Sequence, residues 1–399
     1  MRIRLQPSAL VFCLSTLSLV GCATFADEAN DEDLSDLDQA AEGTAAPLCS
    51  AAQLADIFSG ANRTIKLTCS LSFSRHAPGT PNANKVIANT LLLEGTSGSN
   101  IVVDCGGGKI APPSKVALHI RSRLVSSSAR GGAWEPIRNV AVRNCVIVGN
   151  SRVYGMSEST GGEGYVSSRF DAGHTARAQA AGPRDIRFRK NAFSEFGTAI
   201  YFSVGVTKAQ VRENTFAAKT DYSAIYLNAE SNGAVVADNE FRVDSAREII
   251  AVDGSANNVI RGNRFYLGAS TAGAVYLYRN CGERGMIRHQ APTGNQLIEN
   301  KVERKYVGFN LPRWIPAPAP FFWLGSRQGV ASYCGDDTGF PWGSSADNGD
   351  FASDNVVRDN LFWVHMFTPT SGSSADNVAG AIGANYPRNI VSGNRFGQW

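Results

Sequence analysis

The sequence lacks several features that would assign a function directly. It has no CxxC pair and no cluster of His and Cys at zinc-ligand spacing, which argues against a structural zinc site. Its basic residues are scattered and form no run, so nucleic-acid binding is not expected. Its N-terminal apolar run, residues 9–20, is too short to span a bilayer stably. Two classes of protein therefore become poor candidates: domains held together by a structural zinc and nucleic-acid binders.

The N-terminus predicts export. Two arginines precede the apolar run, as in a secretory signal. The run ends in LVGC, which resembles a bacterial lipobox; by that resemblance, cleavage leaves Cys22 lipidated at the new N-terminus. A signal peptide with a chance cysteine is the alternative. Ala23 follows, which is compatible with the outer membrane in proteobacterial lipoproteins. We expect residues 1–21 to be the signal, and the protein to meet the outer membrane or cell surface through this lipid only.

The next segment has almost no capacity to fold. Residues 22–46 form a tether in which positions 23–46 hold eight acids and no Lys or Arg, so we expect disorder. Residues 47–399, the predicted folded domain, keep 36 basic and 27 acidic residues, a net charge of +9. This charge suits a polyanion such as an acidic polysaccharide, although the sign alone decides little.

Six cysteines remain after Cys13 and Cys22 are set aside, and an even count in an exported protein favours disulfides. Other pairings stay open, but the simplest is sequential: Cys49–Cys69, Cys105–Cys145 and Cys281–Cys334. The last pair would tie the loop that carries His289 to the loop that carries Asp336 and Asp337.

A short motif, apolar-x-x-Asn-x-Phe, recurs along the chain. The spacings from Asn191 to Asn263 are 23, 25 and 24 residues, and later spacings are longer, as expected if loops are inserted into some repeats. The recurring asparagines are Asn144, Asn191, Asn214, Asn239, Asn263, Asn300, Asn360 and Asn394. A period in this range predicts a solenoid or a propeller.

The units are rich in β-branched and aromatic residues, and they are too short for a four-stranded propeller blade. They predict coils of a parallel β-helix, in which equivalent strands pair about 4.8 Å apart. The asparagines would then form a ladder at an inward turn, with Phe two residues later in the core. Over residues 85–399 the chain resembles the pectate-lyase-like class of right-handed parallel β-helix proteins. The predicted fold is therefore an all-β, single-stranded, right-handed parallel β-helix.

Two kinds of segment depart from the repeat. Residues 47–84 predict an N-terminal cap, with a short helix at about 50–58 followed by a strand, because the open end of a solenoid must be covered. Residues 150–184 and 303–353 predict long structureless insertions. Such segments on a rigid scaffold tend to be functional.

A second strand follows each motif, and its apolar residues align so that the intervening side chains point outward. The first outward column contains Tyr201, Tyr226, Ala251, Tyr276 and Trp323. The second contains Ser203, Asn228, Asp253, Tyr278 and Gly325, and the third contains Gly205, Glu230, Ser255, Asn280 and Arg327. The aromatic rings suit pyranose faces, and the polar border suits hydroxyls and carboxylates. Alternatively, the rings stack only to stabilise neighbouring coils.

Two reactions fit such a strip. A lyase acting on uronic acids neutralises the carboxylate with Ca²⁺ or Arg and removes the adjacent proton. Hard oxygen ligands for Ca²⁺ could come from Asp253, Glu230 and Asn228, and the acid or base from Arg279, Tyr278 and His289. A glycosidase needs two carboxylates, for which the candidates are Asp253 with Glu230, or Asp336 with Asp337.

Two of the histidines are candidate site residues, and the motifs of known enzymes with this fold are incomplete or absent. His174 and His289 are predicted to lie in loops beside arginines and are candidates, whereas His119 lies in an apolar alternation and is predicted to be structural. Pectin hydrolases of this fold carry Asn-x-Asp, Asp-Asp, Gly-His-Gly and Arg-x-Lys in that order. Here His174 precedes Asp336 and Asp337, so the order is reversed, and two motifs are missing. The Arg-x-Pro-x-x-Arg motif of pectate lyases and the Asp-Pro-His motif of alginate epimerases are also absent.

The sequence therefore predicts a monomeric, lipid-anchored β-helix enzyme that cleaves a polysaccharide, anionic by preference, by lyase-type β-elimination. A glycoside hydrolase on the same fold and a non-catalytic glycan-binding or adhesion protein are the alternatives. Convergence of two ionisable groups on one open point would favour an enzyme over a binding protein.

Overall fold

The structure is a computed structural model that describes residues 64–66, 71–72, 86–87, 90–112, 115–128, 130–157, 162–268, 270–280, 285–305, 320–325, 339–347, 352–365, 382–384 and 388–398. The chain divides into residues 1–41 and 42–399, and all described residues belong to the second unit. The predicted signal, the predicted lipidation site Cys22, the predicted tether and the predicted helix at about 50–58 lie outside the described residues.

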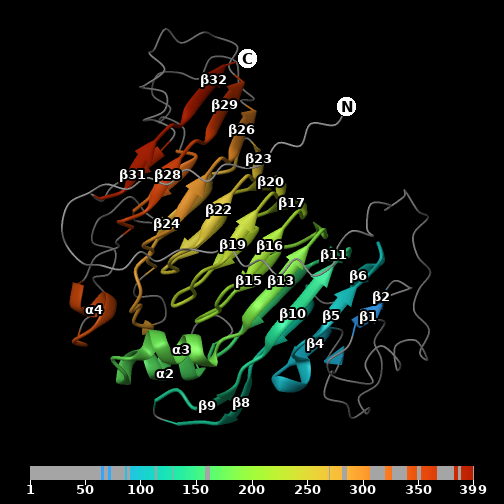
Figure 1. Cartoon of the computed structure of the whole chain (residues 1–399), viewed down its shortest axis with the longest axis vertical. Helices are drawn as coiled ribbons and strands as arrows, with labels where there is room; N and C mark the ends of the chain where they lie inside the picture. Colours follow the sequence, from blue (N-terminus) through green and yellow to red (C-terminus); the bar gives the residue numbers. More distant parts are fainter. Residues whose placement is uncertain are drawn as a thin grey trace, which may run out of the picture. The chain divides into compact units, whose positions relative to one another are not determined.

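Three ten-stranded sheets account for nearly all of the described structure (Figure 1). The first contains β1 (Thr64–Lys66), β5 (Val102–Asp104), β10 (Arg138–Arg143), β13 (Arg184–Arg189), β16 (Gln210–Arg212), β19 (Val235–Ala237), β22 (Val259–Arg261), β25 (Gln296–Ile298), β28 (Val356–Arg358) and β31 (Ile390–Ser392). The second contains β2 (Leu71–Ser72), β6 (Lys109–Ala111), β11 (Val146–Val148), β14 (Ala192–Ser194), β17 (Thr215–Thr220), β20 (Glu240–Ser245), β23 (Arg264–Leu267), β26 (Lys301–Lys305), β29 (Leu361–His365) and β32 (Arg395–Gln398). The third contains β3 (Val86–Ile87), β4 (Thr90–Glu94), β7 (Val116–Arg121), β12 (Asn150–Tyr154), β15 (Ile200–Phe202), β18 (Ile225–Leu227), β21 (Glu248–Asp253), β24 (Gly273–Tyr278), β27 (Phe322–Leu324) and β30 (Ile382–Ala384).

Each complete coil contributes one strand to each sheet, and every described pairing in the three sheets is parallel except β3 with β4. This confirms the predicted parallel β-helix. β1 and β2, which fall in the segment predicted as a cap, already pair with the strands of the next coil. The Asn-x-Phe motif marks the corner between the first and second strands of a coil, as at Asn214 between β16 and β17.

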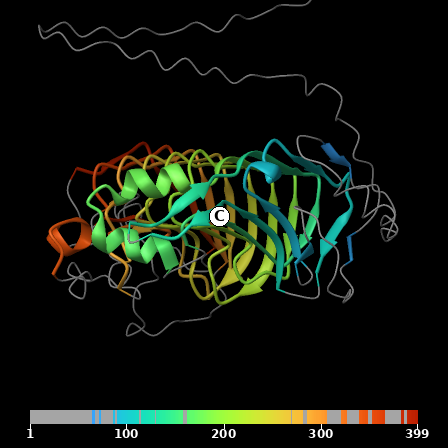
Figure 2. The same ribbon diagram turned by 90° about the horizontal axis from the view of Figure 1, so that it is seen from below.

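The remaining described elements are few. They are the hairpin β8 (Arg123–Ser126) and β9 (Ala133–Glu135), the 3-10 helix η1 (Thr96–Gly98), and the helices α2 (Gly162–Phe170), α3 (His174–Ala181) and α4 (Gly343–Asp347). None of these helices is long and apolar enough to cross a membrane. The prediction that 150–184 is structureless is wrong, because this insertion forms α2 and α3, which lie beside the stacked strands in both views (Figures 1 and 2).

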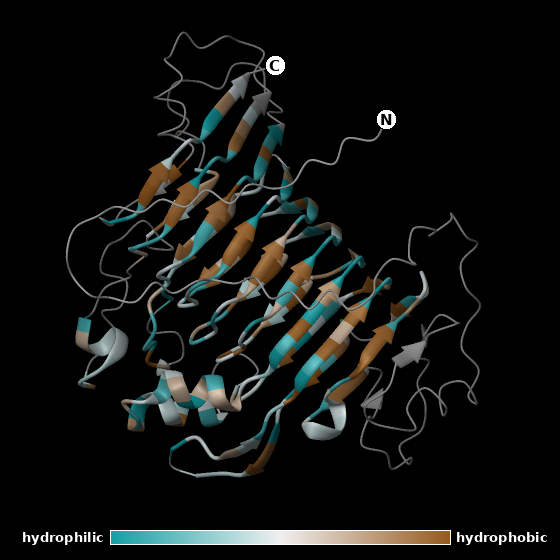
Figure 3. Ribbon diagram, in the orientation of Figure 1, coloured by the Kyte–Doolittle hydropathy of each residue, from teal (hydrophilic) through white to brown (hydrophobic). Residues whose placement is uncertain are grey.

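Inward side chains form the core, and apolar residues recur from coil to coil along the strands (Figure 3). The predicted phenylalanine column is confirmed: neighbouring rings from Phe193 to Phe265 stack with centroids 4.7–4.8 Å apart. The predicted asparagine ladder is confirmed from Asn191 to Asn394, with amide-to-amide hydrogen bonds of 2.8–3.0 Å. These bonds satisfy the polar groups that are buried at this corner of each coil.

Asn144 does not belong to this ladder, contrary to the prediction. Arg143 pairs with Arg189, so Cys145 occupies the position of Asn191, and its backbone N–H donates to the Asn191 side chain. Cys145 forms the predicted disulfide with Cys105. The other predicted disulfides lie outside the described residues.

A second ladder was not predicted. It joins Asn258, Asn295, Asn355 and Asn389 through hydrogen bonds of 2.7–3.2 Å, at a corner five residues before the first ladder. The signal is present in the sequence, since each of these asparagines stands at the same distance from a predicted ladder asparagine.

Candidate functional site

The outward columns of the third sheet are in register, as predicted. Tyr201 pairs with Tyr226, Tyr226 with Ala251, Ala251 with Tyr276, and Tyr276 with Trp323. The alternate residues of these strands, such as Ile225 and Leu227, are buried in the core. The side chains of the two columns therefore project from the outer face of the sheet, and other parts of the chain decide which of them reach solvent.

The columns begin earlier than predicted. His119 pairs with Arg152, and Arg152 pairs with Tyr201, while Arg121 pairs with both Glu94 and Tyr154. We call the partly exposed residues of these columns on the strands from β4 to β18 the outer strip: Glu94, His119, Arg121, Arg152, Tyr154, Tyr201 and Tyr226. Its earlier members were missed because two helices separate β12 from β15. Extending the alternation back through KVALHIR and NSRVY would have found them.

His119 lies on the outer face, although the sequence predicted a structural role for it. Its Nδ1 is 3.2 Å from the Tyr154 hydroxyl oxygen, and the two rings meet edge to face. Arg121 donates a hydrogen bond of 3.1 Å to the same oxygen and forms an ion pair of 2.6 Å with Glu94. Burial lowers the pKa of Arg121, but its contacts with Tyr154 and Glu94 outweigh this effect and raise the pKa overall. The Tyr154 oxygen is thus held between an imidazole and a permanent cation.

Arg152 and two tyrosines form a stack on the next coils. The Arg152 guanidinium carbon lies 4.8 Å from the centre of the Tyr201 ring, and the Tyr201 and Tyr226 rings stack 5.0 Å apart. Because β12 and β18 flank β15, both faces of Tyr201 are covered, and a pyranose cannot stack on them as predicted. The alternative, that stacking stabilises neighbouring coils, describes this ring better. In the part of the chain that the structure describes, no carboxylate forms an ion pair with Arg152.

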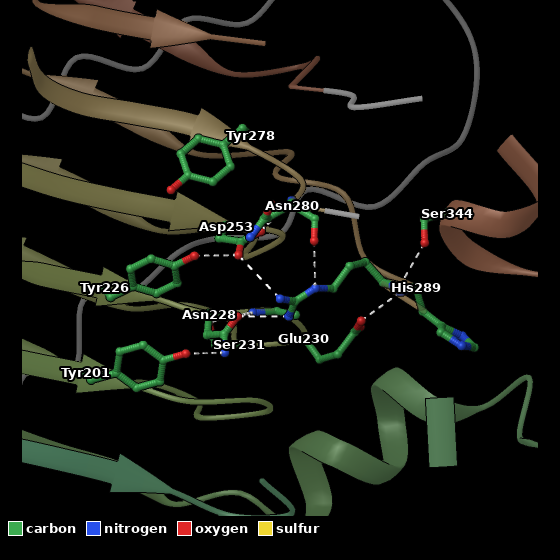
Figure 4. A network of polar contacts seen from close by, with 12 residues as sticks. Tyr201, Tyr226, Asn228, Glu230, Ser231, Asp253, Tyr278, Asn280, His289 and Ser344 are labelled. Carbon is green, nitrogen blue, oxygen red and sulfur yellow. Dashed lines mark hydrogen bonds and ion pairs between the residues drawn. The ribbon is translucent and has the colours of Figure 1, made fainter. Parts of the chain in front are cut away.

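Beside the outer strip lies a network of polar contacts (Figure 4), and several of its side chains, among them Asp253, Glu230 and Arg288, are buried. Asp253 accepts hydrogen bonds of 2.7 Å from the Tyr226 hydroxyl and from the Asn280 backbone N–H. Its carboxylate is also 3.5 Å from the Arg288 guanidinium. Burial raises the pKa of Tyr226 well above its ordinary value, and the Asp253 carboxylate adds to the rise. Tyr226 is therefore a neutral donor fixed on a buried carboxylate.

Arg288 connects the buried Asp253 carboxylate with the outer strip. It donates to the Asn228 side-chain oxygen at 2.9 Å, and the Asn228 amide donates to the Tyr201 hydroxyl at 2.8 Å. We call this set the buried junction: Asn228, Glu230, Asp253, Asn280 and Arg288. Its hydrogen bonds hold the two strip tyrosines from behind.

Glu230 and the two candidate histidines join the helices to the sheet. Glu230 accepts hydrogen bonds from the backbone N–H groups of His289 and Gln290 and from the Thr175 hydroxyl. His174 begins α3 and is not in a loop; it is fully buried, with its ring centre 5.0 Å from that of His289. Burial lowers the pKa of His174 to about 4. Its Nε2 has no hydrogen-bond partner among the described residues.

The later part of the predicted strip is covered. The buried Tyr278 hydroxyl donates to Glu248 at 2.8 Å, and the buried Arg279 guanidinium binds Asp347 of α4. Burial raises the pKa of Tyr276, whose hydroxyl donates to a backbone carbonyl. Trp323 stays partly exposed. The other predicted site residues, Arg327, Asp336 and Asp337, lie outside the described residues.

The buried junction does not fit a cation. Among the described residues, no group of three or more His, Cys, Asp or Glu side chains is placed to hold a metal. The proposed Ca²⁺ ligands Asp253, Glu230 and Asn228 use their oxygens to accept hydrogen bonds, and the Arg288 guanidinium, already a cation, contacts two of them. Nor do the carboxylates of Asp253 and Glu230 face a shared open point, since both are fully buried.

Comparison with known proteins assigns no family. No protein-family model matches the chain, and no curated protein matches it. Among solved structures, it is similar to DFA-IIIase from Arthrobacter chlorophenolicus A6 in complex with DFA-III, at 10% identity and TM-score 0.34, over 87% of this chain and 78% of that one. A mutant tailspike protein of E. coli bacteriophage HK620 matches at 11% identity and TM-score 0.39, over 87% of this chain and 58% of that one. XylC in complex with xylose matches at 12% identity and TM-score 0.29, over 76% and 54% of the two chains. At such identities and TM-scores, these similarities assign no activity to the chain.

Proposed function

We propose that the outer strip binds an acidic polysaccharide and that His119 and Tyr154 cleave it by β-elimination. The observation that carries this proposal is the position of Arg152, whose cation has no described carboxylate partner. It lies one coil from His119 and two residues from Tyr154 on the same face. A guanidinium suits a sugar carboxylate, which it can bind through two parallel hydrogen bonds.

In the proposed reaction, Arg152 binds the carboxylate and stabilises the negative charge that develops when the adjacent C–H bond breaks. The Tyr154 oxygen takes that proton as its own hydroxyl proton passes to His119 Nδ1, 3.2 Å away. The C–H electrons form the new C=C bond, and the C–O bond to the next sugar breaks. Tyr154 then protonates the leaving oxygen and recovers its proton from His119. Arg121 stabilises the phenol oxygen while its charge changes.

Hydrolysis fits this strip less well. A glycosidase needs two carboxylates on opposite sides of the scissile bond. Among the residues that the structure describes, Glu94 is the one carboxylate of the outer strip, and it is bound to Arg121. Asp253 is fully buried under Tyr226 and Arg288. Elimination needs one cation and one base, and the outer strip contains both.

A panel of acidic and neutral polysaccharides tests the proposal. We expect products that absorb in the ultraviolet from acidic polymers only, because elimination leaves a C=C bond conjugated with the carboxylate. Arg152→Gln is expected to lower kcat/KM about 100-fold through loss of a charged hydrogen bond, and Tyr154→Phe to lower kcat about 100-fold or more. Arg242→Gln is the matched control, because Arg242 also lies over a tyrosine, Tyr266, but on the second sheet.

The outcomes separate the alternatives. Reducing ends without ultraviolet absorbance would identify a hydrolase. Binding without any product would identify a glycan-binding protein. Equal loss of activity in Arg152→Gln and Arg242→Gln, or full activity in Arg152→Gln, would show that the site lies elsewhere.

A further inference from the structure

The charges of the outer strip differ on the two sides of His119 and Tyr154. On one side, Arg152 leans over Tyr201 of the next coil and has no described carboxylate partner. On the other side, the Arg121 guanidinium is held by Glu94 of the preceding coil at 2.6 Å. The first position offers a net positive charge, and the second offers an ion pair with no net charge.

These positions lie on successive coils. β4, β7, β12 and β15 are neighbours in that order in the third sheet, so the Glu94–Arg121 pair and the Arg152–Tyr201 pair lie on opposite sides of the His119–Tyr154 contact. Neighbouring strands are about 4.8 Å apart, which is close to the length of one sugar unit in an extended chain. A polymer that runs across the coils would therefore place adjacent sugars at positions of different charge.

We propose that the strip selects a polysaccharide in which an acidic sugar alternates with an uncharged one, and that Glu94 determines this preference. The inference rests on the proposed function of the same strip. Arg152 binds the carboxylate of the acidic sugar, and the Glu94–Arg121 pair meets the hydroxyl or amide groups of its neighbour. A second carboxylate at that position would be repelled by the Glu94 carboxylate, and it could not pair with Arg121, which is already paired with Glu94. Discrimination of this kind depends on repulsion of the wrong partner as much as on attraction of the right one.

The test compares two polymers with the same uronic acid. One is a homopolymer, and the other alternates the uronic acid with an N-acetylhexosamine. We expect wild-type protein to favour the alternating polymer about tenfold in kcat/KM and in retention on affinity gels. Glu94→Gln removes the negative charge but keeps the shape, which leaves Arg121 free to bind a carboxylate. This variant should move both ratios about tenfold toward the homopolymer.

Glu213→Gln is the matched control, because Glu213 also pairs with an arginine of a neighbouring coil, Arg189, but beside the first sheet. Its ratios should equal those of the wild type. Equal use of both polymers by wild-type protein, or an unchanged ratio in Glu94→Gln, would overturn the inference while the cleavage itself upholds the proposed function. Absence of cleavage would refute the proposed reaction, and the affinity gels would still decide the charge preference.

Discussion

Acidification should destabilise the protein through His174. This ring is fully buried at the start of α3, near Glu230, His289, Arg288 and Asp171. Burial lowers its pKa in the folded protein to about 4, against an ordinary value of 6.5. Between these two pH values the unfolded chain binds a proton at His174 that the folded protein does not bind. His174 therefore costs no stability above pH 6.5, and the free energy of unfolding falls as the pH drops from 6.5 toward 4. At about 1.4 kcal/mol for each pH unit, the loss amounts to about 3 kcal/mol.

Chemical denaturation at a series of pH values from 7.5 to 4 measures this loss. Carboxylates also contribute to the pH dependence, so the informative quantity is the difference between wild type and His174→Gln. The variant should lose about 3 kcal/mol less than the wild type between pH 6.5 and 4. Parallel curves for wild type and His174→Gln would refute the reasoning, because they would mean that the buried ring accepts a proton without opening its surroundings.

Three further predictions concern the scaffold. Asn239→Ala removes a buried amide that bonds to the neighbouring asparagines at 3.0 Å on both sides, and it should lower the free energy of unfolding by about 3 kcal/mol in urea titrations; a loss below 1 kcal/mol would show that the ladder contributes little. Arg288→Met leaves the buried Asp253 carboxylate without its cation and should lower the free energy of unfolding by about 3–5 kcal/mol in the same titrations. The double variant Arg288→Met/Asp253→Asn should regain much of that loss, because it also removes the buried negative charge. If the second change restores no stability, the pairing is contradicted. Reduction of the Cys105–Cys145 disulfide, which joins residues 40 positions apart, should cost about 4 kcal/mol of unfolding free energy, and an unchanged midpoint after reduction would argue against a stabilising bond.

The fold was predictable because every coil of a solenoid has the same local structure. Each coil places an amide at the same corner and an aromatic ring at the same core position, so asparagine and phenylalanine, as at Asn239 and Phe241, recur in the sequence at the period of the coil. The alignment was less secure where the motif is degenerate. At Asn144 the asparagine stands one position early, and only the strand pairing identifies Cys145 as the residue at the corner.

The sequence predicted the direction in which the side chains of the candidate site point, but not which of them are exposed to solvent. Alternation along the strands correctly placed Tyr201, Tyr226 and Tyr278 on the outer face, since neighbouring side chains of a strand point to opposite sides. It could not show that Tyr278 and Asp253 are covered, because the segments that cover them come from distant parts of the chain.

The sequence by itself therefore determined the coil, its core, its inward asparagines and the outer face of the third sheet, because these depend on period and alternation. Only the tertiary structure decided which outward residues remain accessible. α3 and the segment around Arg288 bury Glu230 and Asp253, whereas Arg152 and Tyr154 stay partly exposed. Burial and ion pairing depend on contacts between segments that are not separated by a fixed number of residues. The repeat in the sequence therefore does not predict them.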